Sequence, residues 1–171
     1  MLRESASVPE APRYPRKTRP SWLPSEKTDE GDSMGFVFAE LTLRNAGDVE
    51  LVRTGHKKPE EIRQLQVTAL VDTGAYTMAL PEDIVVQLGL PHVENREFDL
   101  ADGSKKEMEV VGPVWIKFKN RQTVCLAVKT HDEDVLLGSI PMEDLDVVIN
   151  PKAQTIEVNP ASPYMPKMKL K

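Results

Sequence analysis

The chain has 171 residues, which is enough for one domain of ordinary size with flanking tails and leaves no room for a second domain of similar size. Hydrophobic residues make up 40% of the sequence and aromatic residues only 5%, so a core must be built mainly from aliphatic side chains. The 22 Lys and Arg residues against 27 Asp and Glu residues give a formal net charge of -5, which argues against nucleic acid as a partner.

The cysteine content and the length of the apolar runs indicate in which cellular compartment the protein works. Cys125 is the single cysteine, which excludes an intramolecular disulfide and a zinc cluster built on cysteines. Apolar runs stay far below the roughly 20 residues that a membrane-spanning helix needs, and no basic segment followed by an apolar stretch opens the sequence. We therefore expect a cytoplasmic protein without membrane contact.

Composition divides the chain into three parts. Residues 1–33 hold six basic and six acidic residues with five prolines and show no hydrophobic periodicity, so we predict a disordered N-terminal arm. The pattern changes at Met34, and residues 34–160 are predicted to form the folded domain. Residues 161–171, with further Pro and Lys, are predicted to be a C-terminal tail.

The first half of the domain predicts two strands and a helix. Residues 36–43 and 65–71 are rich in Val, Leu, Phe and Thr, and the second of these runs ends in an almost wholly apolar stretch typical of a buried strand. Residues 81–89 place Pro at a helix start, acids in the first turn and Gly89 just past the end, which predicts a short helix.

The second half predicts further strands and turns. Asp102-Gly103 suits the tip of a hairpin between residues 97–100 and 106–110, because this dipeptide tolerates positive φ angles. Alternation over residues 114–118 predicts a strand with one buried face, followed by a turn at Asn120-Arg121. Further strands are expected at residues 123–128, 135–138, 146–150 and 154–158, the last two joined around Pro151-Lys152. The fold class is therefore all-β.

One segment carries most of the functional information. An apolar strand runs directly into Asp72, which is followed by Thr73, Gly74 and Ala75. An isolated Asp-Thr-Gly is often only a strand-end turn, in which the carboxylate bonds its own backbone. The segments that follow favour a functional acid over a structural turn, because a helix, a hairpin and an apolar Leu-Leu-Gly strand come after it in order.

This order of parts, over residues 65–158, resembles the retropepsin-like aspartic proteases of clan AA, and especially their single-lobe cellular and bacterial members. The resemblance implies a closed acid-protease barrel with one or two short helices that works as a homodimer. It implies that Asp72 is the catalytic acid and that the Thr73 hydroxyl cross-links two active-site loops. It further implies that Gly74 and Ala75 let backbone amides approach the carboxylates.

The same resemblance assigns two further regions. Leu136, Leu137 and Gly138 resemble the apolar strand that lies behind the catalytic loop, and the family's helix would fall on residues 141–145. The hairpin tip, Ala101, Asp102, Gly103 and Ser104, falls where the family has a mobile flap over bound peptide. Viral flaps are much richer in glycine than this tip, and Ser139-Ile140-Pro141 replaces the more usual acidic or aromatic continuation.

The resemblance also implies a mechanism. Two carboxylates about 3 Å apart cannot both ionise, so one keeps a proton while the other activates water, the arrangement that aspartic proteases exemplify. The chain has one Asp-Thr-Gly, so a second chain must supply the other acid, and residues 155–158 with the Thr73 loop are expected to form the interface. No cofactor or metal is expected, and the substrate is a peptide or protein.

Other readings remain open. His56, His92 and His131 lie far apart in turn-like segments and are predicted to be surface residues, whereas Cys125 lies in an alternating strand and is predicted to be a small core residue. A non-catalytic peptide-binding or assembly module on the same fold is one alternative. A structural β domain in which Asp72 only caps a strand is another.

Overall fold

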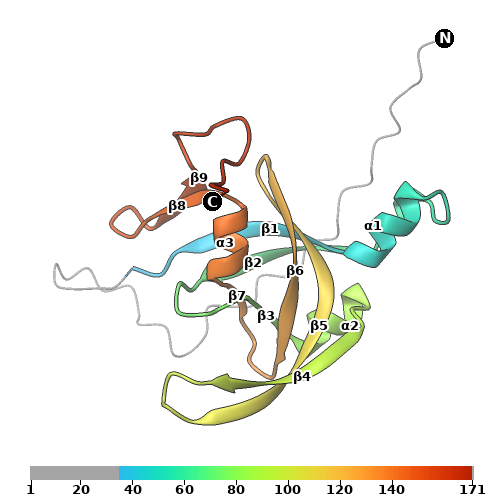
Figure 1. Ribbon diagram of the computed structural model, residues 1–171, viewed down its shortest axis with the longest axis horizontal. Coiled ribbons are helices and arrows are strands. Elements are labelled where there is room, and N and C mark those ends of the chain that lie inside the picture. The colour runs from blue at the N-terminus through green and yellow to red at the C-terminus, as the bar shows by residue number, and fades with distance from the viewer. Residues whose placement is uncertain (1–34, 171) are drawn as a thin grey trace.

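The computed structural model describes residues 35–170, so the predicted arm at residues 1–33 lies outside the described residues. This part of the chain forms nine strands, three α-helices and one short 3-10 helix, as the all-β prediction requires (Figure 1). The strands are β1 (Phe38–Asn45), β2 (Gln64–Val71), β3 (Met78–Pro81), β4 (His92–Asp99), β5 (Lys105–Phe118), β6 (Arg121–Thr130), β7 (Val135–Leu137), β8 (Val147–Asn150) and β9 (Thr155–Val158). The helices are α1 (Ala46–Arg53), η1 (Pro59–Glu61), α2 (Glu82–Leu88) and α3 (Ser139–Asp144).

Six of the strands close into a barrel. Hydrogen bonding follows the order β1-β2-β7-β3-β6-β5, and β5 pairs back onto β1, with Thr42 opposite Lys117 and Asn45 opposite Val114. Closure leaves the barrel without open sheet edges. β4 pairs only with β5 among the described strands, and β8 and β9 form a separate two-stranded sheet beside α3 (Figure 1).

The core is aliphatic, as the composition predicts. Strand periodicity sends alternate residues inward, so Leu41 and Leu43 of β1 face Val67 and Leu65 of β2, and all four are buried. The alternation predicted over residues 114–118 is confirmed, because Val114, Ile116 and Phe118 are buried whereas the residues between them are more exposed. The barrel therefore offers a rigid frame for the loops at its ends.

The predicted turn at Asn120-Arg121 is wrong by one residue. The turn is at Lys119-Asn120, where Lys119 adopts a positive φ of 51°, and Arg121 opens β6 opposite Phe118. The Arg121 side chain is only 1% exposed, and its Nη2 donates to the carbonyl oxygen of Ser162. The sequence favoured a turn because Arg121 is hydrophilic and follows Asn120. In the structure the C-terminal segment covers the Arg121 side chain, so the residue lies in a strand.

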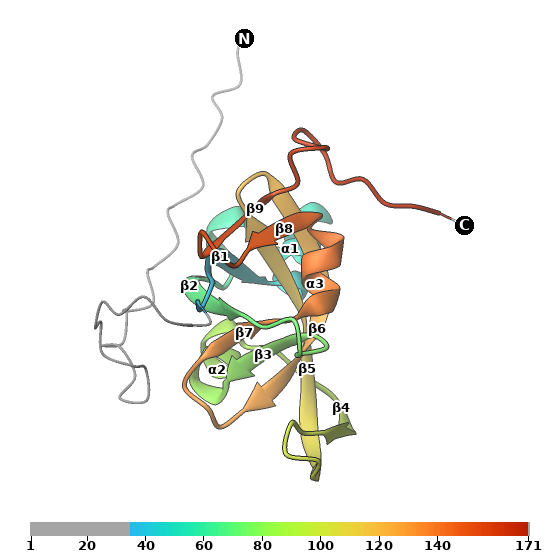
Figure 2. The same cartoon turned by 90° about the vertical axis from the view of Figure 1, so that its left-hand side faces the viewer.

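Residues after β9 pack against the domain through one carboxylate. Asp146 accepts hydrogen bonds from the side chains of Asn159 and Ser162 and from the backbone N–H of Lys167 at 2.9 Å. These donors lower the pKa of Asp146 to about 2. The first residues of the predicted 161–171 tail therefore lie on the domain, and the chain leaves it only beyond them (Figure 2).

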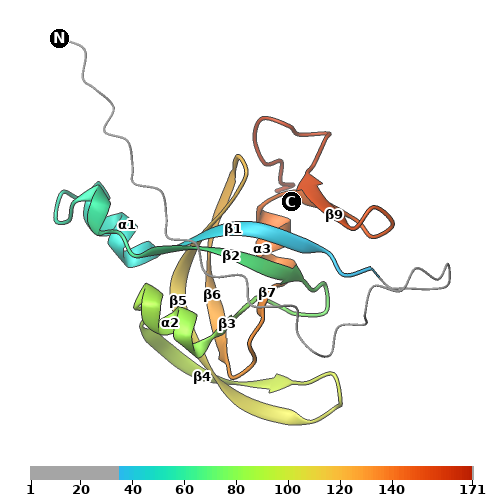
Figure 3. The ribbon, with the colours of Figure 1, turned by 180° about the vertical axis from the view of Figure 1, so that it is seen from behind.

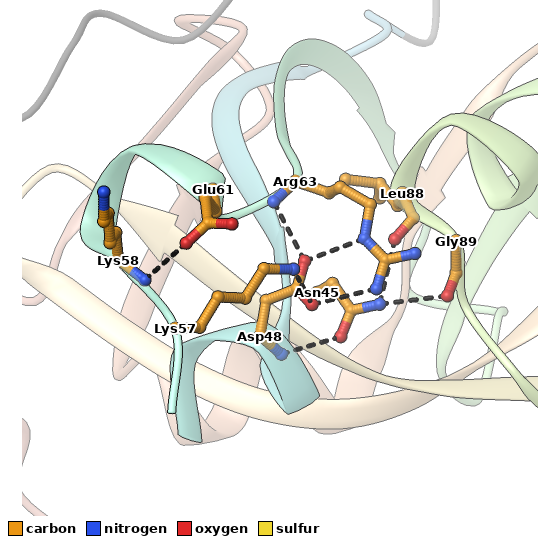
Figure 4. A network of polar contacts seen from close by, with 8 residues as sticks. All are labelled: Asn45, Asp48, Lys57, Lys58, Glu61, Arg63, Leu88 and Gly89. Carbon is orange, nitrogen blue, oxygen red and sulfur yellow. Dashed lines mark hydrogen bonds and ion pairs between the residues drawn. The ribbon is translucent and has the colours of Figure 1, made fainter. Parts of the chain in front are cut away.

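Helix α1 was not predicted, and a polar network fixes it to the barrel (Figure 4). Asn45 caps the helix by accepting from the backbone N–H of Asp48 at 3.1 Å, while its side-chain amide donates to the carbonyl oxygens of Leu88 and Gly89. Asp48 is 2% exposed and bonds Lys57 Nζ and Arg63 Nε, each at 2.8 Å. This network ties α1, the start of β2 and the end of α2 together.

Candidate active site

Asp72 lies at the end of β2, held in a tight turn. Its backbone N–H donates to the carbonyl oxygen of Leu137 at 3.0 Å, and its own carbonyl accepts from the N–H of Ala75 at 3.2 Å. The carboxylate Oδ1 accepts from the backbone N–H of Gly74 at 2.9 Å. These three bonds fix both the backbone and the carboxylate of Asp72.

The bond from Gly74 to Asp72 has the i to i+2 spacing of an Asx turn, which is the feature that the structural reading of this acid predicts. The same bond fixes the orientation of the carboxylate. Asp72 is half-buried, and Thr73 and Gly74 are exposed. The turn therefore presents a fixed carboxylate at the molecular surface, next to residues that a second molecule can reach.

Strand β7 lies directly behind this loop, between β2 and β3. Leu137 is fully buried and pairs in parallel with Val71, while Leu136 pairs with Leu70 of β2 and Ala79 of β3. Two further bonds clamp the loop from behind, from the N–H of Ser139 to the carbonyl oxygen of Ala75 at 2.9 Å and from Ile140 to Tyr76 at 3.1 Å. Leu136, Leu137 and Gly138 thus form the backing of the Asp72 turn.

Gly138 is needed for this close approach. A Cβ atom on Gly138 would stand 2.2 Å from the carbonyl oxygen of Thr77 and 2.7 Å from that of Ala75, distances that no side chain tolerates. The contacting atoms belong to the backbone and cannot swing away. The short helix that follows is α3, Ser139–Asp144, which begins two residues before the range 141–145 expected from the resemblance.

The predicted hairpin is present and longer than expected. β4 and β5 pair antiparallel from Asp99 opposite Lys105 back to His92 opposite Val111. Of the eight residues of β4 only Phe98 is half-buried, and the others are exposed, so the hairpin projects from the barrel. It extends on the side where the loop between β2 and β3 lies (Figure 3).

The tip of this hairpin is polar and internally bonded. Asp102 accepts from the Ser104 hydroxyl at 2.6 Å and from the Ser104 N–H at 2.9 Å, and these bonds lower the pKa of Asp102. Gly103 supplies the positive φ, 81°, that the turn requires. Ala101 and the other tip residues are exposed.

Between the hairpin and the Asp72 loop lies a groove of about 270 Å³ that is open to solvent. Its lining includes Tyr76 and Thr77 of the loop, Ile140 of α3 and residues of the hairpin strands. Thr77 is fixed there by a hydrogen bond from its hydroxyl to the carbonyl oxygen of Leu126 at 2.7 Å. The remaining lining residues are Arg96, Phe98, Val110, Val124, Cys125, Leu126 and Val128.

Sequence reasoning missed this groove. Val124, Leu126 and Val128 alternate along β6, and that spacing was a readable sign of one shared face. The spacing could not show that this face lines a groove, because the groove exists only where the hairpin and the loop lie close to β6 in space.

The three histidines lie where they were predicted, whereas Cys125 is a core residue only in part, because it also lines the groove. His56, His92 and His131 are exposed. Cys125 is half-buried against the core, and burial raises the pKa of its thiol to about 11. Within residues 35–170, no three His, Cys, Asp or Glu side chains gather as metal ligands. None of the helices in this part of the chain has the length and apolar character needed to cross a bilayer.

Comparison with known proteins finds one family that part of this chain resembles. Residues 60–140 match the family model described as gag-polyprotein putative aspartyl protease. The match begins before β2, includes the Asp72 turn, the β4–β5 hairpin and β7, and ends in α3. A comparison with curated proteins gave no match. A closed barrel with a fixed Asp-Thr-Gly turn, backed by an apolar strand and faced by a hairpin, agrees with that match, which relates residues 60–140 of the chain to the retropepsin-like aspartyl proteases.

Proposed function

We propose that two copies of this chain pair to form an aspartic endopeptidase in which each contributes Asp72. The observation that carries the proposal is the Asp72 turn, where a carboxylate is fixed by the Gly74 N–H at 2.9 Å and backed by β7, within the segment that matches the aspartyl protease family. Thr73 and Gly74 beside it are exposed. An exposed Asp-Thr-Gly turn suits contact with its own copy across a two-fold axis.

The chemistry needs both acids. With two carboxylates in contact, the pair holds one proton, and the anionic member accepts a proton from a water molecule as that water attacks the peptide carbonyl carbon. The protonated member donates a hydrogen bond to the carbonyl oxygen, and the tetrahedral intermediate forms. Breakage of the C–N bond then follows as the amide nitrogen takes a proton from the pair, which restores the single shared proton.

The groove supports a peptide as substrate. Its floor and walls are mostly apolar, and it begins at Tyr76, four residues after Asp72. An extended peptide lying between the loop and the hairpin would place alternate side chains in it. The hairpin strands above the groove are suited to closing over such a peptide, with Asp102 and Gly103 at the moving tip.

The interface is proposed at the Thr73 loop and at β9. The β8–β9 sheet has no third strand among the described residues, and Val148 on β8 is 40% exposed. Unpaired strand edges of this kind favour pairing with another chain. A partner here would bury the apolar surface and bring the two Asp72 turns together.

The proposal is tested by incubating the purified chain with a mixed peptide library from acidic to neutral pH and identifying fragments by mass spectrometry. We expect internal cleavage that requires neither added metal nor cofactor and that is lost in Asp72→Asn. Peptide binding without cleavage at any pH would instead favour the alternative of a non-catalytic binding module on the same fold.

A further inference from the structure

The groove beside the Asp72 loop has a mostly apolar lining that includes one charged side chain. Its lining includes the apolar side chains of Val124, Leu126 and Val128 of β6, and Phe98 of β4 adds an aromatic ring. One charged residue, Arg96, stands among the described residues that line it. A substrate side chain entering the groove therefore meets apolar surface and a single guanidinium.

Arg96 and Phe98 lie two residues apart on β4, so they share one face of the hairpin, and that face turns toward the groove. The guanidinium is thus held by a strand and not by an isolated flexible loop. Its position next to a ring and a row of branched side chains lowers the local dielectric when a peptide covers the groove, which strengthens any ion pair formed there.

In the free chain Arg96 is paired with Glu94, also on β4. The two side chains are 49% and 45% exposed. An exposed pair of this kind contributes between about 0 and 1 kcal/mol, so it is readily exchanged. Glu94 does not line the groove, so its carboxylate can move into solvent when another carboxylate takes the guanidinium.

The guanidinium has a planar fork of donors that matches a carboxylate in a bidentate pair. A substrate Glu or Asp that reaches Arg96 would replace the solvent-exposed carboxylate of Glu94 with a carboxylate in the covered groove. The exposed pair that is lost contributes little free energy. We infer that Arg96 makes this enzyme select peptides with an acidic side chain at one position flanking the cleaved bond, next to apolar residues that fill the rest of the groove. This inference rests on the proposed function, since it concerns the substrate of the same site.

The test uses the full-length protein and synthetic decapeptides with apolar residues at the centre, in which each flanking position in turn is Gln, Glu or Lys. Cleavage is followed as kcat/KM at low and at high salt. At one flanking position we expect kcat/KM for the Glu peptide to exceed that for the Gln peptide by about five- to tenfold at low salt. This ratio corresponds to a free energy between that of an exposed ion pair and that of a partly desolvated one. High salt should reduce that ratio.

Three variants identify the residue responsible. Arg96→Glu should reverse the preference at the same position, so that Lys exceeds Gln. Arg96→Lys should keep a smaller preference for Glu, because the charge remains but the fork is lost. Arg53→Glu is the matched control, since Arg53 forms a similar exposed pair with Glu50 on α1, away from the groove, and it should leave the preference unchanged.

A binding measurement separates this inference from the proposed function. The same decapeptides, carrying a fluorophore, are titrated with wild-type and Asp72→Asn protein, and anisotropy is recorded. Tighter binding of the Glu peptide that disappears in Arg96→Glu supports the inference even if no peptide is cleaved, in which case only the proposed hydrolysis fails. Cleavage with equal rates for Gln and Glu at every position, a preference that survives in Arg96→Glu, or no binding of any decapeptide would overturn it.

Discussion

Gly138 lies against the backbone of Thr77 so closely that a Cβ atom on Gly138 would stand 2.2 Å from the Thr77 carbonyl oxygen. The Asp72 turn can therefore rest on β7 only if position 138 has no side chain. Gly138→Ala should force the loop and α3 apart and destabilise the fold by at least about 1–3 kcal/mol, the cost of overpacking a close contact. Urea unfolding monitored by circular dichroism measures this.

Gly55→Ala is the control for that change. Its φ of 77° makes alanine unfavourable by roughly 1–2 kcal/mol, but a Cβ there would meet open space. Gly138→Ala should lower both stability and peptide cleavage, whereas Gly55→Ala should leave cleavage unchanged, because Gly55 follows α1 and does not line the groove. Equal stability of Gly138→Ala and wild type would show that β7 does not press on the loop as described.

The catalytic assignment is tested by Asp72→Asn. Removal of the acid should lower kcat by about 10²–10⁴-fold or more, the contribution of general acid–base catalysis, while the bond from Gly74 remains available to the amide oxygen. Thermal unfolding should change little. Asp132→Asn, a change of the same chemistry at an exposed loop position, should keep full activity. Turnover by Asp72→Asn at the wild-type rate would refute the assignment.

The carboxylate of Asp48, held in the network of Figure 4, should contribute to the loss of stability in acid. A hydrogen bond from Arg63 is the main reason that the pKa of Asp48 is held far below its usual range, with Lys57 adding to it. Its contribution is complete above the unfolded pKa of about 4 and is lost progressively as pH falls below that value. The unfolding free energy of wild type should therefore fall below pH 4 more steeply than that of Asp48→Asn, which keeps only the contributions of other carboxylates such as Asp146.

At neutral pH, Asp48→Asn should cost about 2–3 kcal/mol, less than a fully buried pair because Lys57 and Arg63 retain some solvent contact. Glu50→Gln removes an exposed pair with Arg53 on the same helix and should change stability little. Urea titrations of both variants between pH 2 and 7 give the comparison. Identical pH profiles for wild type and Asp48→Asn would contradict the role given to this carboxylate.

Cys125 lines the groove without taking part in the proposed chemistry. Burial raises the pKa of its thiol to about 11, so the thiol is protonated at neutral pH and should react slowly with iodoacetamide. Cys125→Ser should therefore keep the same pH dependence of kcat as wild type. A large loss of kcat with KM unchanged would mean that the thiol contributes to the reaction.

Much of the fold could be predicted because local patterns and tertiary structure agree. Pro81 and Gly89 bracket α2 as expected, with Gly89 in the left-handed conformation at φ 58°. The run before Asp72 becomes β2, and Asp102-Gly103 lies at a hairpin tip. In each case a residue with a special backbone preference marks a boundary.

Other features depend on contacts that a sequence does not display. Helix α1 is held by Asp48 through residues nine and fifteen positions away, and its own apolar pattern is weak. β3, residues 78–81, is too short to be distinguished from the loop before α2. The groove joins Tyr76, Arg96 and Ile140 from three separate segments, so only the closed barrel reveals it.

The central claim is that activity requires two Asp72 side chains from two chains. It is tested most directly by measuring rate against protein concentration alongside sedimentation velocity under the same conditions. In the range where monomer predominates, the rate should fall with the square of total protein, because only the dimer has a complete acid pair. A rate that stays linear at concentrations where only monomer sediments would contradict it.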